Sequence, residues 1–311
     1  MLRRLLPLIV AIVGLLALFR YLSPNFLEAD NLLDIVQQIS VNAILAFGMT
    51  MVILIGGIDL SVGALLALAG TVTTYALIPD GWHAGLGLSL AAGFGVAALF
   101  GLFHGITAAK TGMPPFIITL GTMLVARGLA LGFNEGRPMP IPHGETFLLA
   151  IGNGRIGDTL PIPVVIMMSA YLLCAATLHF TVFGRHLYAI GNSRLAALYS
   201  GIHVVRCEII VYFIASLLTA LAGLIQTSQL FNAEPAAGQG FELNAIAAAV
   251  VGGASLQGGR GAMTGTLLGA IIIGILDKGL NQAGVHFSYQ SIIKGAVILV
   301  AVGLDSWKKK Q

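Results

Sequence analysis

The chain has 311 residues, of which 57% are hydrophobic and 9% charged, with a mean hydropathy of +0.92 and a formal net charge of +3. A soluble domain carries roughly 25% charged residues, so this composition excludes a soluble globular protein. Apolar runs of about 20 residues recur, without the alternation typical of barrel strands. The sequence therefore predicts an all-α integral membrane protein.

The first apolar run follows Arg3 and Arg4 and looks like a secretory signal. It is followed by FRYLS, residues 19–23, which offers no small-x-small cleavage site, so we expect an uncleaved first helix. About ten transmembrane helices are predicted in all, and an even number places both termini on one side. The predicted spans are about 5–22, 41–55, 60–78, 85–109, 114–133, 162–182, 208–231, 242–255, 261–280 and 288–305.

The distribution of Lys and Arg between these spans predicts the orientation, because cytoplasmic loops are the richer in both. With the N-terminus inside, the outer residues are Arg20, Arg137, Arg155 and Lys278. The inner set is larger and comprises Arg3, Arg4, Lys110, Arg185, Arg194, Arg206, Arg260, Lys308, Lys309 and Lys310. Both termini are therefore predicted to be cytoplasmic.

The stretch GGIDLSVG, residues 56–63, places an acid and two glycines between apolar runs, toward the predicted cytoplasmic side. An intramembrane carboxylate is costly and marks a functional hypothesis. In one interpretation Gly56 and Gly57 end a helix and Asp59 caps the next one. In the other, a discontinuous helix pair with Asp59 and Ser61 lines or gates a pathway. The two interpretations are compatible.

Glycine patterns recur near the end of the chain. GGASLQGG, residues 252–259, shares GG-x-x-L and the final glycine with residues 56–63, and either an internal repeat or chance accounts for the match. Gly261, Gly265 and Gly269 fall four apart, so we expect one helix face that packs closely against a neighbouring backbone.

Other polar groups also fall inside apolar spans. Arg127, in FIITLGTMLVARGLAL, either snorkels to the outer surface or pairs inside the bundle, and Lys294 poses the same alternative. Asn42 and Gln226 are predicted to form hydrogen bonds between helices rather than to bind substrate.

Two loops are long. The outer loop, about residues 134–161, is rich in Gly and Pro and is expected to be an irregular cap. The inner loop, about 184–206, contains a predicted short amphipathic helix over 193–200. That helix either docks into a groove on a partner or lies on lipid. Because no long linker occurs, residues 1–311 are predicted to form a single transmembrane domain.

The sequence contains no enzyme motif. GITAAKT, residues 105–111, lacks the second glycine of a phosphate loop, and no protease or HExxH motif is present. Cys174 and Cys207 belong to no metal-binding cluster. We expect no catalytic residue, metal or cofactor in this chain and no ATP binding by the chain alone. Transport is the leading class of function.

Four stretches resemble the permease subunit of bacterial ABC importers for monosaccharides, the ribose-type sugar permeases. They are GMTMVILIGGIDLSVGALLALAG (48–70), PPFIITLGTMLVARGLA (114–130), GRHLYAIGNSRLAALYSGI (184–202) and ELNAIAAAVVGGASLQGGRGAMTGTLLGA (242–270). The resemblance implies a multi-pass subunit of the bacterial inner membrane that dimerises with a second copy or a similar permease. It also implies cytoplasmic ATPase subunits that bind ATP-Mg, and a periplasmic sugar-binding protein. Membrane lipid is an expected partner and nucleic acid is not.

The resemblance also assigns roles to residues. In the family the coupling segment often reads Gly-Asn-x-Glu-Ala-Ala, whereas here Leu195 takes the acidic position and the Gly-Asn pair sits one residue earlier. Which side chains contact the ATPase is therefore left open. The residues assigned to ATPase coupling are Gly191, Asn192, Arg194, Leu195, Ala196, Ala197 and Gly201. The pathway or gating candidates are Asp59, Ser61 and Arg127.

Other functions stay open on the sequence. One is a secondary transporter driven by protons or sodium, which would want a carboxylate relay. Another is an ABC permease that exports, or that carries a nucleoside, a branched-chain amino acid or another small polar solute. The match over GGIDLSVG favours sugars but does not distinguish one sugar from another.

Overall fold

The computed structural model describes residues 2–142, 144–157 and 159–308. Over these ranges the chain forms thirteen α-helices, one 3-10 helix and four two-residue strands. In chain order they are α1 (Leu2–Leu22), α2 (Ala29–Leu54), α3 (Val62–Leu77), α4 (Leu86–Thr111), α5 (Pro115–Gly132), η1 (Phe133–Gly136), β1 (Met139–Pro140), α6 (Thr146–Asn153), β2 (Arg155–Ile156), β3 (Leu160–Pro161), α7 (Ile162–Phe180), α8 (Val182–Asn192), α9 (Arg194–Tyr199), α10 (Val204–Gln229), β4 (Asn232–Ala233), α11 (Phe241–Val251), α12 (Met263–Gln282) and α13 (Phe287–Lys308).

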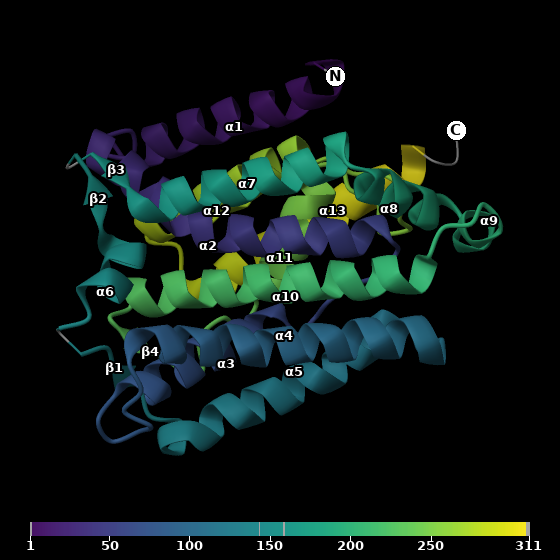
Figure 1. The fold of residues 1–311 in the computed structure, drawn as a ribbon. Coiled ribbons are helices and arrows are strands. Elements are labelled where there is room, and N and C mark those ends of the chain that lie inside the picture. Colours follow the sequence, from purple (N-terminus) through teal and green to yellow (C-terminus); the bar gives the residue numbers. More distant parts are fainter. Residues whose placement is uncertain (1, 143, 158, 309–311) are drawn as a thin grey trace.

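Helix α2 lies at the centre of the bundle (Figure 1). It packs against α7, α10, α11 and α12. On the far side of α10, helix α4 packs against α10, α3 and α5. Over an 18-residue apolar window, 78% of α2 is buried, against 6% of α1 at the periphery. An apolar helix enclosed by other helices is the expected core of a membrane protein, because lipid surrounds only the outer ones.

Seven helices are long and apolar enough to cross a membrane: α1, α2, α4, α5 with η1, α7, α10 and α12. Helices α3 and α11 are apolar but have only 16 and 11 residues, and each adjoins a glycine-containing break. Together with the 22 residues of α13, these helices lie at the sequence positions of the ten predicted spans. The mostly helical class is confirmed.

The predicted start of the second span is wrong. Helix α2 begins at Ala29, three turns before the predicted start at 41. Its first half carries Asp34, Gln37 and Gln38, whose polarity is typical of a loop when hydropathy alone is considered. These side chains line a cavity instead of facing lipid. The hydropathy of the sequence therefore fails to reveal the part of a spanning helix that has one face lining a polar cavity.

Both long loops are more ordered than predicted. The outer loop contains α6, which packs on α10, the antiparallel pair of β2 with β3, and β1, which pairs with β4 beyond the end of α10. The inner loop contains α8, which follows α7 directly. Thr181 caps α8, its Oγ1 accepting the Gly184 N–H at 3.1 Å.

The two ends of the bundle differ in what they carry (Figure 1). The strands and α6 lie at one end. At the other end lie α8 and α9, together with the first turn of α1 and the last turn of α13. Lys309 and Lys310, of the predicted basic C-terminus, are outside the described residues. We call the first of these the strand end and the second the α9 end.

Candidate functional site

The first helix break follows α2 and ends it as the paired glycines predict. Gly56 has a φ of +81°, in the left-handed region that favours glycine. Its N–H donates to Ile53 O and the Gly57 N–H to Val52 O, both at 2.9 Å. These two bonds form a Schellman motif, which satisfies carbonyls at a helix end.

Asp59 is buried in this break, with 1% of its surface exposed. Its Oδ1 accepts the N–H of Ser61 at 2.8 Å and the Ser61 hydroxyl at 2.6 Å. Ser61 is itself the N-cap of α3. Asp59 therefore does not cap the first turn of α3, as one interpretation of the sequence held. It closes a tight turn that leads into the helix, the arrangement that Asp forms with the backbone two residues on.

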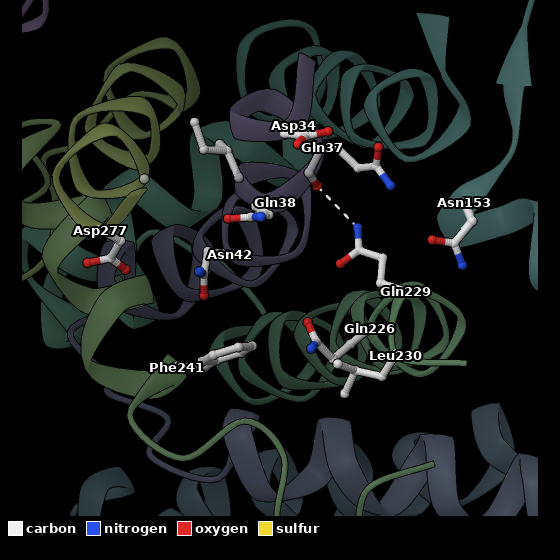
Figure 2. A pocket seen from close by; sticks show the side chains of 12 residues that line it. Asp34, Gln37, Gln38, Asn42, Asn153, Gln226, Gln229, Leu230, Phe241 and Asp277 are labelled. Carbon is white, nitrogen blue, oxygen red and sulfur yellow. Dashed lines mark hydrogen bonds between the residues drawn. The ribbon is translucent and has the colours of Figure 1, made fainter. Parts of the chain in front are cut away.

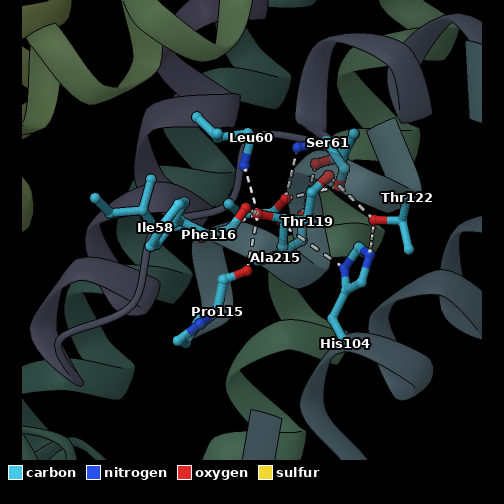
Figure 3. Close-up of polar contacts among 11 residues, drawn as sticks. Ile58, Leu60, Ser61, His104, Pro115, Phe116, Thr119, Thr122 and Ala215 are labelled. Carbon is cyan, nitrogen blue, oxygen red and sulfur yellow. Dashed lines mark hydrogen bonds and ion pairs between the residues drawn. The ribbon is translucent and has the colours of Figure 1, made fainter. Parts of the chain in front are cut away.

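Helices α4 and α5 hold the break from one side (Figure 3). Thr119 Oγ1 accepts the Leu60 N–H at 3.0 Å and lies 3.2 Å from Ile58 O, so one side chain bridges the break. His104 is fully buried, with Nδ1 3.8 Å from Asp59 Oδ2 and Nε2 2.6 Å from Thr122 Oγ1. Sequence analysis missed these residues. The available signal was a polar residue inside an apolar run.

Unpaired polar atoms collect around this break. Among the described residues, Asp59 Oδ2, His104 Nδ1, Tyr212 Oη and Ser216 Oγ are buried without a hydrogen-bond partner. A Cβ on Gly57 would overlap Tyr212 Oη, which places α10 against the break. Buried polar groups are nearly always paired, so several unpaired ones together indicate a region with a role beyond packing.

The second break follows α11 and has the same helix end. Gly253 has a φ of +94° and its N–H donates to Val250 O, while the Ala254 N–H donates to Ala249 O, both at 2.9 Å. The two breaks also touch, since the Gly259 N–H donates to Leu54 O at 2.9 Å. The two breaks are therefore similar helix ends that lie side by side. The left-handed glycine is the first of its pair at Gly56 and the second of its pair at Gly253, so the helix ends are one residue out of register with the sequence match.

The predicted small-residue face of α12 packs against α11. A Cβ on Gly265 would overlap Gly252 O, and one on Gly269 would overlap Ala248 O. The two helices therefore approach through their backbones at Gly265 and Gly269, as the spacing predicts, whereas Gly261 lies in the segment before α12 and not on its face.

The last turn of α8 contacts both breaks at Gly191. A Cβ on Gly191 would overlap Leu54 O, at the end of α2, and Gly259 N, in the second break. Asn192 lies beside Gly259, and its Nδ2 donates to Tyr188 O at 2.8 Å. Only a residue without a side chain fits at position 191. We call the contact among Gly191, Leu54 and Gly259 the glycine junction.

Helix α9 follows α8 directly and lies within one residue of its predicted bounds. Ser193 is its N-cap, with Oγ accepting the Ala196 N–H at 3.2 Å. Arg194 donates to both carboxylate oxygens of Glu208, from Nε at 2.8 Å and Nη2 at 3.2 Å. This hydrogen bonding raises the pKa of Arg194, so the guanidinium that ties α9 to α10 stays charged.

The side chains of α9 divide into a buried and an exposed set. Ala197 is buried, whereas Leu195 is 62% exposed, Leu198 54% and Tyr199 81%. Gly201, with a φ of +80°, ends the segment. Three exposed apolar side chains on one short helix are typical of a surface that another molecule covers.

The two basic residues within spans pair inside the protein. Arg127 Nη1 donates to Pro235 O at 2.6 Å, and Lys294 Nζ lies 2.8 Å from Asp277 Oδ1. For Lys294 the geometry favours pairing inside the bundle, whereas half-buried Arg127 binds the segment after β4 at the strand end. Arg127 thereby contacts the segment after β4, two turns of α5 beyond Thr119, and so lies apart from Asp59.

A polar cavity of about 470 Å³ opens toward the strand end (Figure 2). It is lined by Asp34, Gln37, Gln38, Ile39, Asn42, Asn153, Gln226, Gln229, Leu230, Phe241, Gly274 and Asp277. Asn42 and Gln226 do not form the predicted hydrogen bonds between helices: within the described chain, Asn42 Oδ1 is buried without a partner, and the Gln226 side chain forms no hydrogen bond. Both border the cavity.

Comparisons with known proteins agree with this geometry. Residues 31–302 match a family described as "Branched-chain amino acid transport system / permease component". Over 287 residues the chain is 46% identical to the ribose import permease protein of Bacillus subtilis (strain 168), covering 92% of this chain and 88% of that protein. Over 303 residues it is 45% identical to the ribose import permease protein of Escherichia coli (strain K12), covering 97% and 93%.

The D-allose transport system permease protein of Escherichia coli (strain K12) is 38% identical over 305 residues, which cover 96% of this chain and 89% of that protein. No solved structure matches the chain. Because the family match and these relatives extend over nearly the whole sequence, the chain belongs to this family of transport-system permeases.

Proposed function

We propose that the chain is the permease subunit of an ATP-driven monosaccharide importer in the bacterial inner membrane. The observation that carries this proposal is the similarity, over nearly the full length, to permeases named for ribose and allose import. The chain supplies the translocation pathway, and ATP-Mg binds to partner ATPase subunits. On this proposal, we expect the chain itself to supply neither an ATPase site nor a cofactor site.

The proposed topology has ten spans with both termini in the cytoplasm. It is supported by ten helices at the sequence positions of the predicted spans, seven of which are long and apolar enough to cross a membrane. The start of α1, the last turn of α13 and the α9 end all lie together, which an even number of spans requires (Figure 1). Residues 1–311 then form one transmembrane domain whose strand end faces the periplasm.

The proposed partners occupy opposite ends. ATPase subunits cover the exposed apolar side chains Leu195, Leu198 and Tyr199 at the α9 end. A periplasmic sugar-binding protein docks on the strand end, and a second permease copy or a similar subunit completes the pathway. Arg127, which holds the segment after β4, positions part of that outer surface.

The glycine junction supplies a direct route from the ATPase to the membrane domain. When a nucleotide-driven movement displaces α9, α8 moves with it, and Gly191 acts on the end of α2 and on the second break together. Asp59 and Ser61 form the turn at the first break. Opening that turn exchanges its contacts with Thr119 and His104, which makes it a gating element.

The test is sugar-stimulated ATPase activity in membrane discs that contain the chain with its neighbouring ATPase and sugar-binding subunits. We expect ATP hydrolysis to rise when the binding protein carries one particular monosaccharide. Uptake driven by a proton or sodium gradient, without recruitment of an ATPase, would instead identify a secondary transporter. Stimulation by a nucleoside or by leucine would identify another substrate class.

A further inference from the structure

The polar cavity lies where a solute would enter and is not part of the coupling route. Its lining comes from the first half of α2, the end of α6, the end of α10, the start of α11 and α12, all toward the strand end (Figures 1 and 2). Its volume of about 470 Å³ is within the range of about 300–1,000 Å³ that is usual for small-molecule sites. Size and position are therefore those of a binding site for a small solute.

Some of its polar side chains form a fixed frame. Gln37 Nε2 donates to Gly152 O at 2.8 Å, Gln229 Nε2 donates to Gln37 O at 3.2 Å, and Asn153 Nδ2 donates to Ser228 O at 2.5 Å. These bonds tie α2, α6 and α10 together around the cavity. A frame of this kind holds the wall of a site in place before a ligand arrives.

Other polar side chains in the lining are not used by the protein. Asn42 Oδ1 is buried and unpaired, and Gln226 and Gln38 form no side-chain hydrogen bond within the described residues. An amide offers both a donor and an acceptor, and a carboxylate such as Asp34 offers two acceptors. A ligand rich in hydroxyl groups, each both donor and acceptor, would satisfy all of them. Phe241 adds an apolar wall for the carbon face of such a ligand.

The charges around the cavity decide which solute fits. The described lining contains two carboxylates, Asp34 and Asp277, and neither Lys nor Arg. The nearby Lys294 is already paired with Asp277. An amino acid or a sugar phosphate would bring an anionic group with no cation to receive it, which is costly in a partly buried site. A neutral polyhydroxyl ligand meets no such cost.

We propose that this cavity binds one neutral monosaccharide weakly within a single permease subunit, using Asn42 and Gln226 as its central hydrogen-bonding groups. This inference rests on the proposed function. The sugar enters from the binding protein at the strand end and is held before the breaks open. Weak binding suits this position, because a tightly held sugar would leave slowly.

The experiment compares Asn42→Leu and Gln226→Met, which keep the side-chain size and remove the polar atoms, with Thr71→Val. Thr71 is a matched control, since its Oγ1 is also buried and unpaired but lies on α3, outside the cavity. Saturation-transfer NMR with D-ribose, D-allose, D-fructose and L-leucine detects weak binding to each full-length variant in discs. Uptake by the complete transporter is measured in parallel.

We expect saturation transfer to one of the three sugars in wild-type protein and in Thr71→Val. In Asn42→Leu and Gln226→Met we expect saturation transfer to fall about fivefold and uptake to fall about tenfold. Two separate variants keep the test decisive if one of them does not assemble. Reduced saturation transfer and uptake in both variants, with normal values in Thr71→Val, would support the cavity as the sugar site.

Two results would overturn different statements. If wild-type protein imports a sugar and both cavity variants keep normal transfer and uptake, the cavity is not the sugar site but the proposed function stands. If the transporter moves L-leucine and no sugar, and leucine transfer falls in both variants, the proposed function and the choice of a neutral ligand both fail.

Discussion

The two helix breaks share one helix end but are held in different ways. After the Schellman motif, the first break continues with Asp59, which forms a turn with Ser61 at the start of α3. Asp59 faces His104 of α4, and Thr119 of α5 accepts the neighbouring Leu60 N–H. The second contains a similar turn, in which the Gln257 N–H donates to Ser255 Oγ at 3.4 Å, and in addition Gly258 and Gly259 pack on the backbone of α8 and α2. Hydrogen bonds can be exchanged for others during a movement, whereas backbone contact transmits displacement through shape. On the proposed mechanism, we therefore expect the first break to open and the second break to transmit the displacement of α8.

Replacing the buried carboxylate of the first break should have the largest effect. Asp59→Leu leaves the Ser61 N–H and His104 without their partner and is expected to cost about 3–5 kcal/mol, enough to prevent assembly. Asp59→Asn keeps the acceptor for Ser61 and should change stability by less than about 1 kcal/mol while slowing uptake about tenfold. Thermal unfolding and sugar uptake measure the two effects. Normal uptake by Asp59→Asn, with wild-type stimulation of ATP hydrolysis, would contradict the gating role.

At the glycine junction we expect a smaller loss of stability but a complete loss of coupling. The valine side chain in Gly191→Val would overlap backbone atoms at Leu54 and Gly259. This overpacking should lower the free energy of unfolding by about 2 kcal/mol. ATP hydrolysis should no longer respond to the sugar-loaded binding protein. Gly95→Ala is the control, since a Cβ there meets nothing within 4 Å. If Gly191→Val responds normally, the junction does not transmit movement.

Removing the bridge across the first break should have a moderate effect. Thr119→Val leaves the Leu60 N–H without its acceptor, which costs about 1.5 kcal/mol. Thr177→Val on α7 is the comparison, because Thr177 is half-buried and its hydroxyl donates only within its own helix, to Leu173 O. Unfolding temperatures in discs should separate the two. Equal unfolding temperatures would mean that α5 does not hold the break.

The smallest effect is expected at α9, outside both breaks. Arg194→Lys keeps the charge but loses the two-point contact with Glu208. Because the pair is half-exposed, the substitution should lower the free energy of unfolding by less than about 1 kcal/mol. Affinity for the ATPase should fall about threefold, as measured by titrating the ATPase against discs. Arg185→Lys, on the exposed part of α8, serves as the control. If Arg194→Lys abolished the response of ATP hydrolysis to the sugar-loaded binding protein, as Gly191→Val is expected to do, the salt bridge would be the element that transmits movement.

Most of the fold was predictable because a membrane imposes simple patterns. Runs of span length predict helices, and paired glycines predict the end of α2. The start of α2 was not predictable, since Asp34, Gln37 and Gln38 look like a loop unless the cavity beside them is known. The same holds for α8, where Thr181 caps a new helix immediately after α7 and leaves no polar gap.

The candidate site was predictable only in its local part. Asp59 and Ser61 stand out because an acid and a hydroxyl interrupt an apolar run. Their neighbours His104 and Thr119 come from other helices, and a single polar residue in a span does not reveal what it faces. Asn42 and Gln226 were noticed but given the wrong role, because only the packed structure shows that their amides border a cavity.

The glycine junction has a consequence for how such a subunit can be re-engineered. Its contacts are made by backbone atoms at Leu54 and Gly259, while the outward face of α9 is made by the side chains of Leu195, Leu198 and Tyr199. Which ATPase binds, and how its movement reaches the membrane domain, therefore depend on separate atoms. Exchanging residues at 195, 198 and 199 should let the same membrane domain accept a different ATPase, with the inner machinery left untouched.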